Sequence, residues 1–188
     1  MTEPFGRAWC ARFPTSVSIA DLKEPFRTAV SRFLAALTNA EDSCSHAPYV
    51  HVSVTYRPPE RAYLMHTAWQ IAHGLADPAG VPAFPGLSID WTHGGDHAAA
   101  VAAAKDMVAE YDIAFAPSGP SSRHCSHEAV DMTIKWDGTL NIRNAHGTLL
   151  AISSAPHDGT NPELAKIGAE FGVIKLVGDK PHWSIDGH

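Results

Sequence analysis

One stretch of the chain decides its fold class: AVDMTIK at residues 129–135, followed by WDGT at residues 136–139. Its β-branched residues favour an extended strand, and an Asp-Gly pair is typical of the turn in a β-hairpin. Two more strands are expected directly after it, at about 139–143 and 148–153. The stretch therefore predicts an antiparallel sheet with hairpin connections.

Helical patterns lie on both sides of these strands. Phe26, Val30, Phe33 and Leu37 recur at helical spacing and predict a helix over about 24–39. The other expected elements are helices at 60–73, 96–110 and 161–171, strands at 49–56, 113–115 and 173–177, and a long surface loop at 74–95. Because strands and helices are segregated, the predicted class is α+β, an antiparallel β-sheet flanked by helices.

Length and composition predict one globular domain. The chain has 188 residues, of which 45% are hydrophobic, enough for a real core. Residues 1–48 are expected to form a helical N-terminal extension packed on the rest of the domain. The formal net charge of −6 argues against nucleic acid as a partner, because phosphate binding needs a basic surface.

The sequence predicts no membrane insertion. No stretch approaches the roughly 20 apolar residues that cross a bilayer. The first residues, MTEPFGR, lack the pattern of a signal peptide, so we expect a cytoplasmic location as synthesised. Cys10, Cys44 and Cys125 are odd in number and have no CxxC spacing, which indicates ordinary thiols rather than a disulfide framework.

Two short motifs carry residues that bind metal. The run SRHCSHEAVD ends at Asp131 and contains His124, and the run DKPHW near the C-terminus contains Asp179 and His182. Two imidazoles and a carboxylate leave the fourth position of a zinc ion open, which is typical of catalytic rather than structural zinc sites. The chain has 12 histidines, however, so surface or core histidines at these positions remain the alternative.

The same residues resemble a known family. The pattern SxHxxHxAxD at 122–131 resembles the SxHxxGxAxD motif of the zinc D-alanyl-D-alanine carboxypeptidases of the VanY type. That family includes L-alanyl-D-glutamate endopeptidases, and its fold is shared with the Hedgehog signalling domain. The run DKPHW at 179–183 resembles its second motif, and Thr55-Tyr56-Arg57 resembles its SGYR element. The resemblance implies a Hedgehog/DD-peptidase-like fold.

The resemblance also implies roles for individual residues. His124, Asp131 and His182 would be the ligands of Zn²⁺, and Asp179 would be the general base. Arg57 would hold the scissile carbonyl or a substrate carboxylate.

Three further residues are candidates for substrate binding, and each has an alternative. Ser122 would support the first ligand or contact substrate. His127 stands where the family has glycine, and is either a substrate contact or a surface histidine. Trp183 is either a substrate contact or a packing residue.

The function that the resemblance implies is hydrolysis of an amide bond in the peptide stem of bacterial peptidoglycan. The expected protein is a monomeric zinc peptidase, of the D,D-carboxypeptidase or endopeptidase type. It would reach the wall after release or export, as a phage endolysin or secreted effector. The alternatives are a non-catalytic, zinc-stabilised binding module of the same fold and a peptidase that acts on another substrate.

Overall fold

The computed structural model describes residues 3–188, which form two compact units. The first unit consists of the chain up to Pro14 together with Arg57–Cys125, and the second of Thr15–Tyr56 together with Ser126–His188. Each unit has a hydrophobic core of its own. This division differs from the expected single domain with an extension at 1–48, because Leu22 and Phe26 belong to the core of the second unit.

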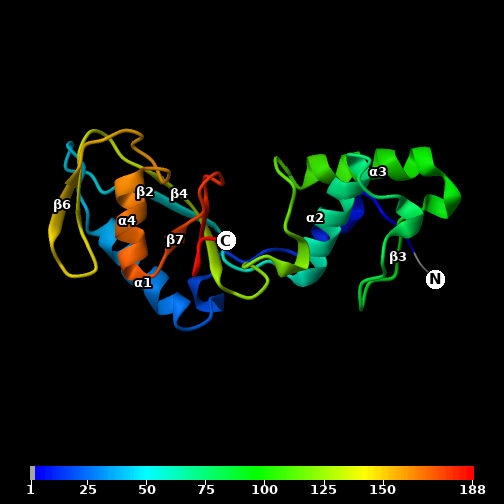
Figure 1. Ribbon diagram of the computed structural model, residues 1–188, viewed down its shortest axis with the longest axis horizontal. Helices are drawn as coiled ribbons and strands as arrows, with labels where there is room; N and C mark the ends of the chain where they lie inside the picture. The colour runs from blue at the N-terminus through cyan, green and yellow to red at the C-terminus, as the bar shows by residue number, and fades with distance from the viewer. Residues whose placement is uncertain (1–2) are drawn as a thin grey trace. The chain divides into compact units, whose positions relative to one another are not determined.

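Two α-helices are the longest elements of the first unit (Figure 1). They are α2 (Pro59–Ala72) and α3 (His97–Glu110), close to their predicted ranges. α2 begins with a proline, whose fixed φ suits a first turn. At the start of α3, the Asp96 carboxylate accepts a hydrogen bond from the Ala99 N–H at 3.0 Å. Alanines at 100 and 104 are fully buried in the core of this unit, where their small size lets neighbouring elements approach closely.

The segment 74–95 is mostly irregular, as expected, and a buried tryptophan anchors it. Trp91 donates from Nε1 to the Tyr63 hydroxyl at 3.0 Å, and that hydroxyl donates to the Pro82 carbonyl at 2.8 Å. The segment also contains β3 (Ile89–Asp90), which pairs in parallel with β1 (Glu3–Pro4). The short elements of this unit are the 3₁₀ turns Arg7–Ala11, Pro78–Gly80, His93–Gly95 and Gly119–Ser121. The predicted strand at 113–115 is wrong, since these residues follow α3 as an irregular segment.

The second unit is built on an antiparallel sheet of four strands in the order β2-β4-β8-β7. The strands are β2 (Tyr49–Val54), β4 (Ala129–Lys135), β7 (Ile174–Lys175) and β8 (His182–Ser184). A separate hairpin consists of β5 (Leu140–Arg143) and β6 (Leu149–Ile152). The predicted α+β class with an antiparallel sheet is confirmed.

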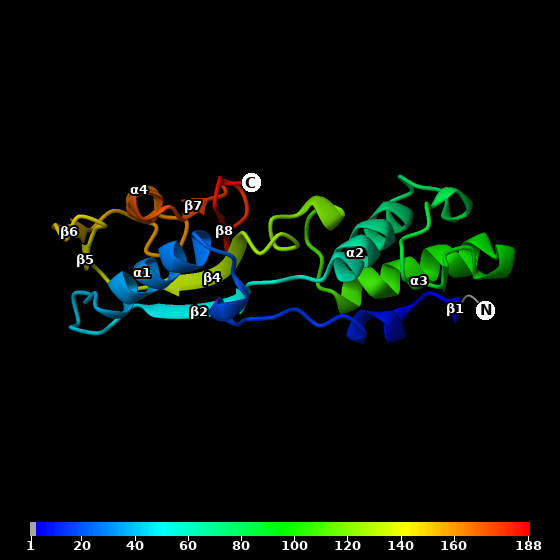
Figure 2. The same ribbon diagram turned by 90° about the horizontal axis from the view of Figure 1, so that it is seen from below.

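Helices α1 (Phe26–Thr38) and α4 (Pro162–Phe171) lie on the same side of β2 and β4 (Figure 2). Phe26, Val30, Phe33 and Leu37 project from one face of α1 into the core, and each is at most 1% exposed. Burying a side chain of this kind stabilises the fold by about 1.5–3 kcal/mol. The predicted helix over 24–39 therefore forms because its apolar stripe meets the sheet.

The turn at 136–139 does not join a hairpin, which corrects the prediction. At the end of β4 next to the turn, β2 pairs on one side and Lys135 forms a β-bridge with Asp158 on the other, and β5 pairs with β6 instead. The turn bonds to an earlier loop: Asp137 O accepts from Ser43 N at 3.3 Å, and Thr139 N donates to Ser43 Oγ at 2.7 Å. The chain does bend at Asp137 and Gly138, but the predicted hairpin is wrong because the strand partners are decided elsewhere in the chain.

The C-terminal strand region also differs from expectation. The strand predicted at 173–177 is only Ile174–Lys175, and a further strand, β8, begins at His182. The chain reverses at Gly178, whose φ of +100° favours glycine. A three-residue strand is too short to show alternation in the sequence.

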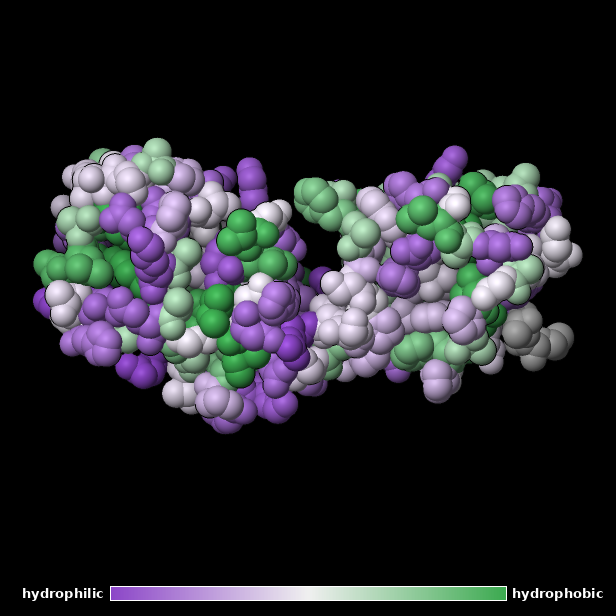
Figure 3. All heavy atoms as spheres, viewed as in Figure 1, coloured by the Kyte–Doolittle hydropathy of each residue, from purple (hydrophilic) through white to green (hydrophobic). Residues whose placement is uncertain are grey.

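No helix among residues 3–188 combines the length and apolar character needed to cross a membrane. On the face shown in Figure 3, hydrophobic residues form several separate patches with hydrophilic residues between them.

Candidate metal centre

The pairing of β4 with β8 builds the centre of the site. It places Asp131 directly opposite His182 in the antiparallel register. The Nδ1 atom of His182 lies 3.1 Å from Oδ1 of Asp131, and both residues are buried. Two residues 51 positions apart are thus brought together by backbone hydrogen bonding between strands.

His124 completes the group. It lies in the turn before β4 and is 2% exposed. One ligand atom from each of His124, Asp131 and His182 lies within 4.8 Å of the others. The structure therefore brings together the three residues predicted to bind metal.

The donor set and its spacing fit a zinc ion. Donor atoms about 2 Å from a tetrahedral ion lie roughly 3.3 Å from one another, and the observed Nδ1–Oδ1 separation is 3.1 Å. Imidazole and carboxylate together are donors that zinc accepts readily.

Further hydrogen bonds orient the ligands. The other ring nitrogen of His182, Nε2, lies 3.2 Å from the carbonyl oxygen of His188. Ser53 Oγ donates to the Asp131 carbonyl at 3.3 Å. A histidine ligand usually has its second ring nitrogen bonded to a carbonyl or carboxylate, which sets the ring orientation.

Ser122 supports the first ligand. Its hydroxyl oxygen accepts a hydrogen bond from the backbone N–H of His124 at 3.4 Å. The carbonyl of His124 in turn accepts from the backbone N–H of Arg57 at 3.3 Å. Of the two roles expected for Ser122, the geometry shows the supporting one.

Asp179 lies in the turn between β7 and β8 and is not among the grouped ligand atoms. Its backbone carbonyl accepts from His182 N at 3.3 Å and also from the Lys175 ammonium. Its negative charge acts on Lys175, as does that of Asp131. The Lys175 ammonium therefore interacts electrostatically with both carboxylates.

The sequence does not predict a structural role for Lys175. Its Nζ donates to three carbonyls, those of Asp179, Leu176 at 2.9 Å and His182 at 3.0 Å. Burial lowers the pKa of Lys175 from its usual value, and the nearby carboxylates oppose this shift. The ammonium thus ties the turn that precedes His182 to the end of β7. A single lysine in an apolar strand pattern gives no sign of this role.

The backbone conformation of His127 is one that favours glycine, the residue that the resembled motif has at this position. Its φ is +63°, a conformation that glycine adopts without strain and histidine only occasionally. The ring stacks on Tyr56 with centroids 4.0 Å apart, and Nδ1 lies 2.6 Å from the Asp21 carbonyl oxygen. The structure thus shows a stacked ring with a backbone partner, and a substrate contact for His127 stays a prediction.

Trp183 is a packing residue, which corrects its assignment to substrate binding. The side chain is fully buried, and its ring centroid lies 5.5 Å from that of Phe33. It alternates with His182 along β8, so it points to the opposite side of the strand. A side chain with no exposed surface cannot contact a substrate.

Comparisons of the chain with family models, with curated proteins and with solved structures found no match.

Proposed function

We propose that the protein is a zinc metallopeptidase that hydrolyses an amide bond in the peptide stem of bacterial peptidoglycan, with the Hedgehog/DD-peptidase-like fold. The observation that carries the proposal is the convergence of His124, Asp131 and His182 from separate parts of the chain. The resemblance of the motifs supplies the substrate class. The residue types point to Zn²⁺ as the metal. A monomeric state and action on the wall after release or export complete the proposal.

Each of the predicted site residues has its own role in the proposed reaction. His124, Asp131 and His182 hold the ion, which supplies Lewis acidity for attack on a carbonyl. Asp179 takes the proton from the attacking water and returns it to the leaving amine. Arg57 holds the scissile carbonyl or a carboxylate of the substrate, a task suited to a planar guanidinium.

Lys175 extends this scheme. Because its ammonium is bonded to the Asp179 and His182 carbonyls, it fixes the turn that links the base to the last ligand. It is a positioning residue, and it would keep Asp179 near the ligands when substrate binds.

The test is cleavage of purified muropeptides, read by mass spectrometry, with bound zinc measured on the same samples. Asp179→Asn should retain zinc and lose about 10²–10⁴-fold in rate, the usual contribution of general acid–base catalysis. His182→Ala should lose both zinc and activity. Asp106→Asn removes an exposed carboxylate on α3 and is the matched control, which should change neither.

Two results would count against this proposal. Bound zinc without turnover of any stem peptide by the wild type would favour a zinc-stabilised binding module. Cleavage of other peptides but not of muropeptides would leave the chemistry in place and overturn the substrate.

A further inference from the structure

A second group of metal-binding side chains lies in the loop between α1 and β2. One ligand atom from each of Asp42, Cys44 and His46 lies within 4.8 Å of the others. Asp42 is buried, whereas Cys44 and His46 are exposed. We propose that these three residues bind a zinc-type transition-metal ion, separately from the group at His124.

The loop is folded around the Asp42 carboxylate. Oδ1 of Asp42 accepts from the backbone N–H of Cys44 at 2.8 Å and of His46 at 3.0 Å, and Asp42 N donates to His46 O at 2.8 Å. The turn is completed by Ser45, whose φ is +60°. These bonds bring three alternate side chains together, so the ligands are assembled before any ion binds.

The hydrogen bonds to the Asp42 carboxylate leave room for a cation. A carboxylate offers about four lone-pair sites, and three hydrogen bonds are present here, at Oδ1 from Cys44 and His46 and at Oδ2 from Asp137 at 3.4 Å. One site on Oδ2 is left for a cation.

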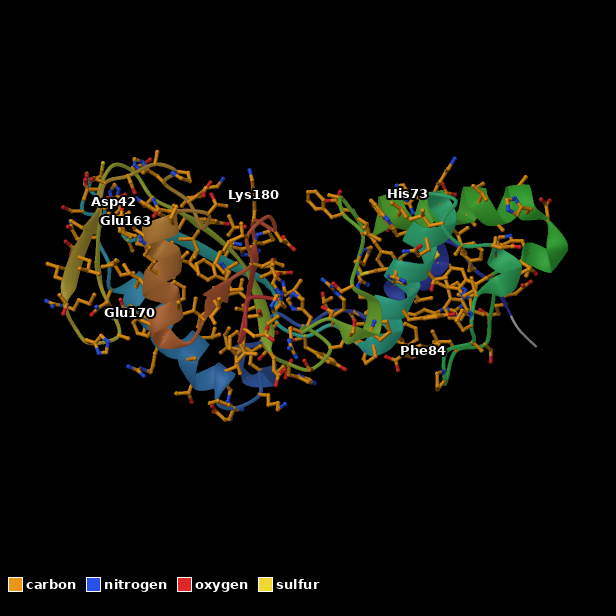
Figure 4. The ribbon with its side chains drawn as sticks, viewed as in Figure 1. Asp42, His73, Phe84, Glu163, Glu170 and Lys180 are labelled. Atoms are coloured by element: carbon orange, nitrogen blue, oxygen red, sulfur yellow. The ribbon has the colours of Figure 1, made fainter. Side chains whose placement is uncertain are left out.

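The loop is held in place by the chain around the turn at 136–139. Glu41 forms a β-bridge with Asn141, with N–O distances of 3.2 and 2.8 Å. Ser43 Oγ accepts from Thr139 N, and a Cβ added at Gly138 would lie only 2.6 Å from that oxygen. Figure 4 labels Asp42 in this loop, at the end of the second unit where β6 lies in Figure 1. A ligand set fixed in this way loses little conformational entropy on binding.

The chemistry of the three donors selects the ion. Thiolate, imidazole and carboxylate are the usual ligands of zinc, whereas magnesium and calcium prefer oxygen donors alone. The Cys44 thiol would lose its proton to solvent when the metal–sulfur bond forms. The chain supplies three ligands, and because Cys44 and His46 are exposed, water can take the fourth position.

The test uses the full chain, stripped of metal and then loaded with zinc or cobalt. Wild-type protein should bind one more zinc ion per chain than Cys44→Ala, measured by elemental analysis after gel filtration. The cobalt form should show a thiolate-to-cobalt absorption band in the near ultraviolet, which Cys44→Ala abolishes. Cys44 is exposed, so its replacement should leave the circular dichroism spectrum unchanged.

Two control variants separate this site from the other. Cys125→Ser removes a half-buried thiol next to His124 and should retain the cobalt band. His124→Ala should lose the other zinc ion and retain the one at Cys44. Failure of the proposed peptidase centre would therefore leave this measurement intact.

A variant that touches no ligand tests the role of the turn at 136–139. Gly138→Ala would displace Ser43, and we expect zinc to bind the loop about 10–100-fold more weakly, the usual effect of disturbing groups that orient a ligand. The proposal is overturned if Cys44→Ala binds as much zinc as the wild type, or if the cobalt form lacks the thiolate band.

Discussion

At Gly168 in α4, helix propensity and packing predict opposite effects of an alanine substitution on the free energy of unfolding. Propensity alone predicts that Gly168→Ala stabilises the protein by about 1 kcal/mol. The structure predicts the opposite. A Cβ at this position would lie 2.7 Å from Cζ3 of Trp183 and 2.9 Å from the Val173 carbonyl oxygen. Both distances are shorter than real Cβ contacts show.

Neither neighbour of Gly168 can move aside at low cost. Trp183 is fully buried against Phe33, and the carbonyl of Val173 belongs to the backbone that leads into β7. Overpacking of this kind costs about 1–3 kcal/mol. After subtraction of the gain in helix propensity, we expect Gly168→Ala to lower the free energy of unfolding by about 0–2 kcal/mol.

The assay is urea unfolding followed by circular dichroism, with Ala169→Gly as the control. Ala169 is exposed on the same helix, so its replacement should cost about 1 kcal/mol through propensity alone. Packing predicts that both variants are less stable than the wild type. An increase in the stability of Gly168→Ala, with the expected loss in Ala169→Gly, would refute the reasoning.

Two further predictions concern a helix cap and a carboxylate. Asn161→Ala should cost about 2–4 kcal/mol of unfolding free energy, since its buried side chain accepts from Glu163 N and Leu164 N and donates to two carbonyls. Asp96→Ala, an exposed cap with one such bond, should cost about 1 kcal/mol in the same urea titration. The hydrogen bond from the Thr160 hydroxyl is the main cause that lowers the pKa of Asp158 below its usual 3.8. The ionised Asp158 therefore stabilises the folded state above pH 3.8, and this contribution is lost as the pH falls through the pKa of Asp158 in the folded protein. Thr160→Val should therefore be less stable than the wild type at pH 7, by a margin that shrinks as the pH falls below about 3.8; a margin independent of pH would contradict this assignment.

The candidate metal ligands were predictable from the sequence only as residue types. The motifs named His124, Asp131 and His182, and the structure brings them together. The role of Lys175 was not predictable, because three carbonyls around one ammonium depend on how the chain reverses at Gly178. The burial of Trp183 was likewise decided by α4 and α1, which lie far from it in the sequence.

Local signals determined much of the fold. The apolar stripe at 26–37, the cap at Asn161 and the β-branched run at 129–135 each act within a few residues, and each element formed where the sequence predicts it. Strand partners are non-local, and the tertiary structure alone decided them. The turn at 136–139 closes no hairpin because the end of β4 next to it bonds to β2 on one side and to residues 157–159 on the other. The three-residue strand β8 exists because β4 and β7 supply its hydrogen-bond partners. Short-range propensity chooses helix or strand, whereas the choice of partner depends on which buried faces meet when the whole chain folds.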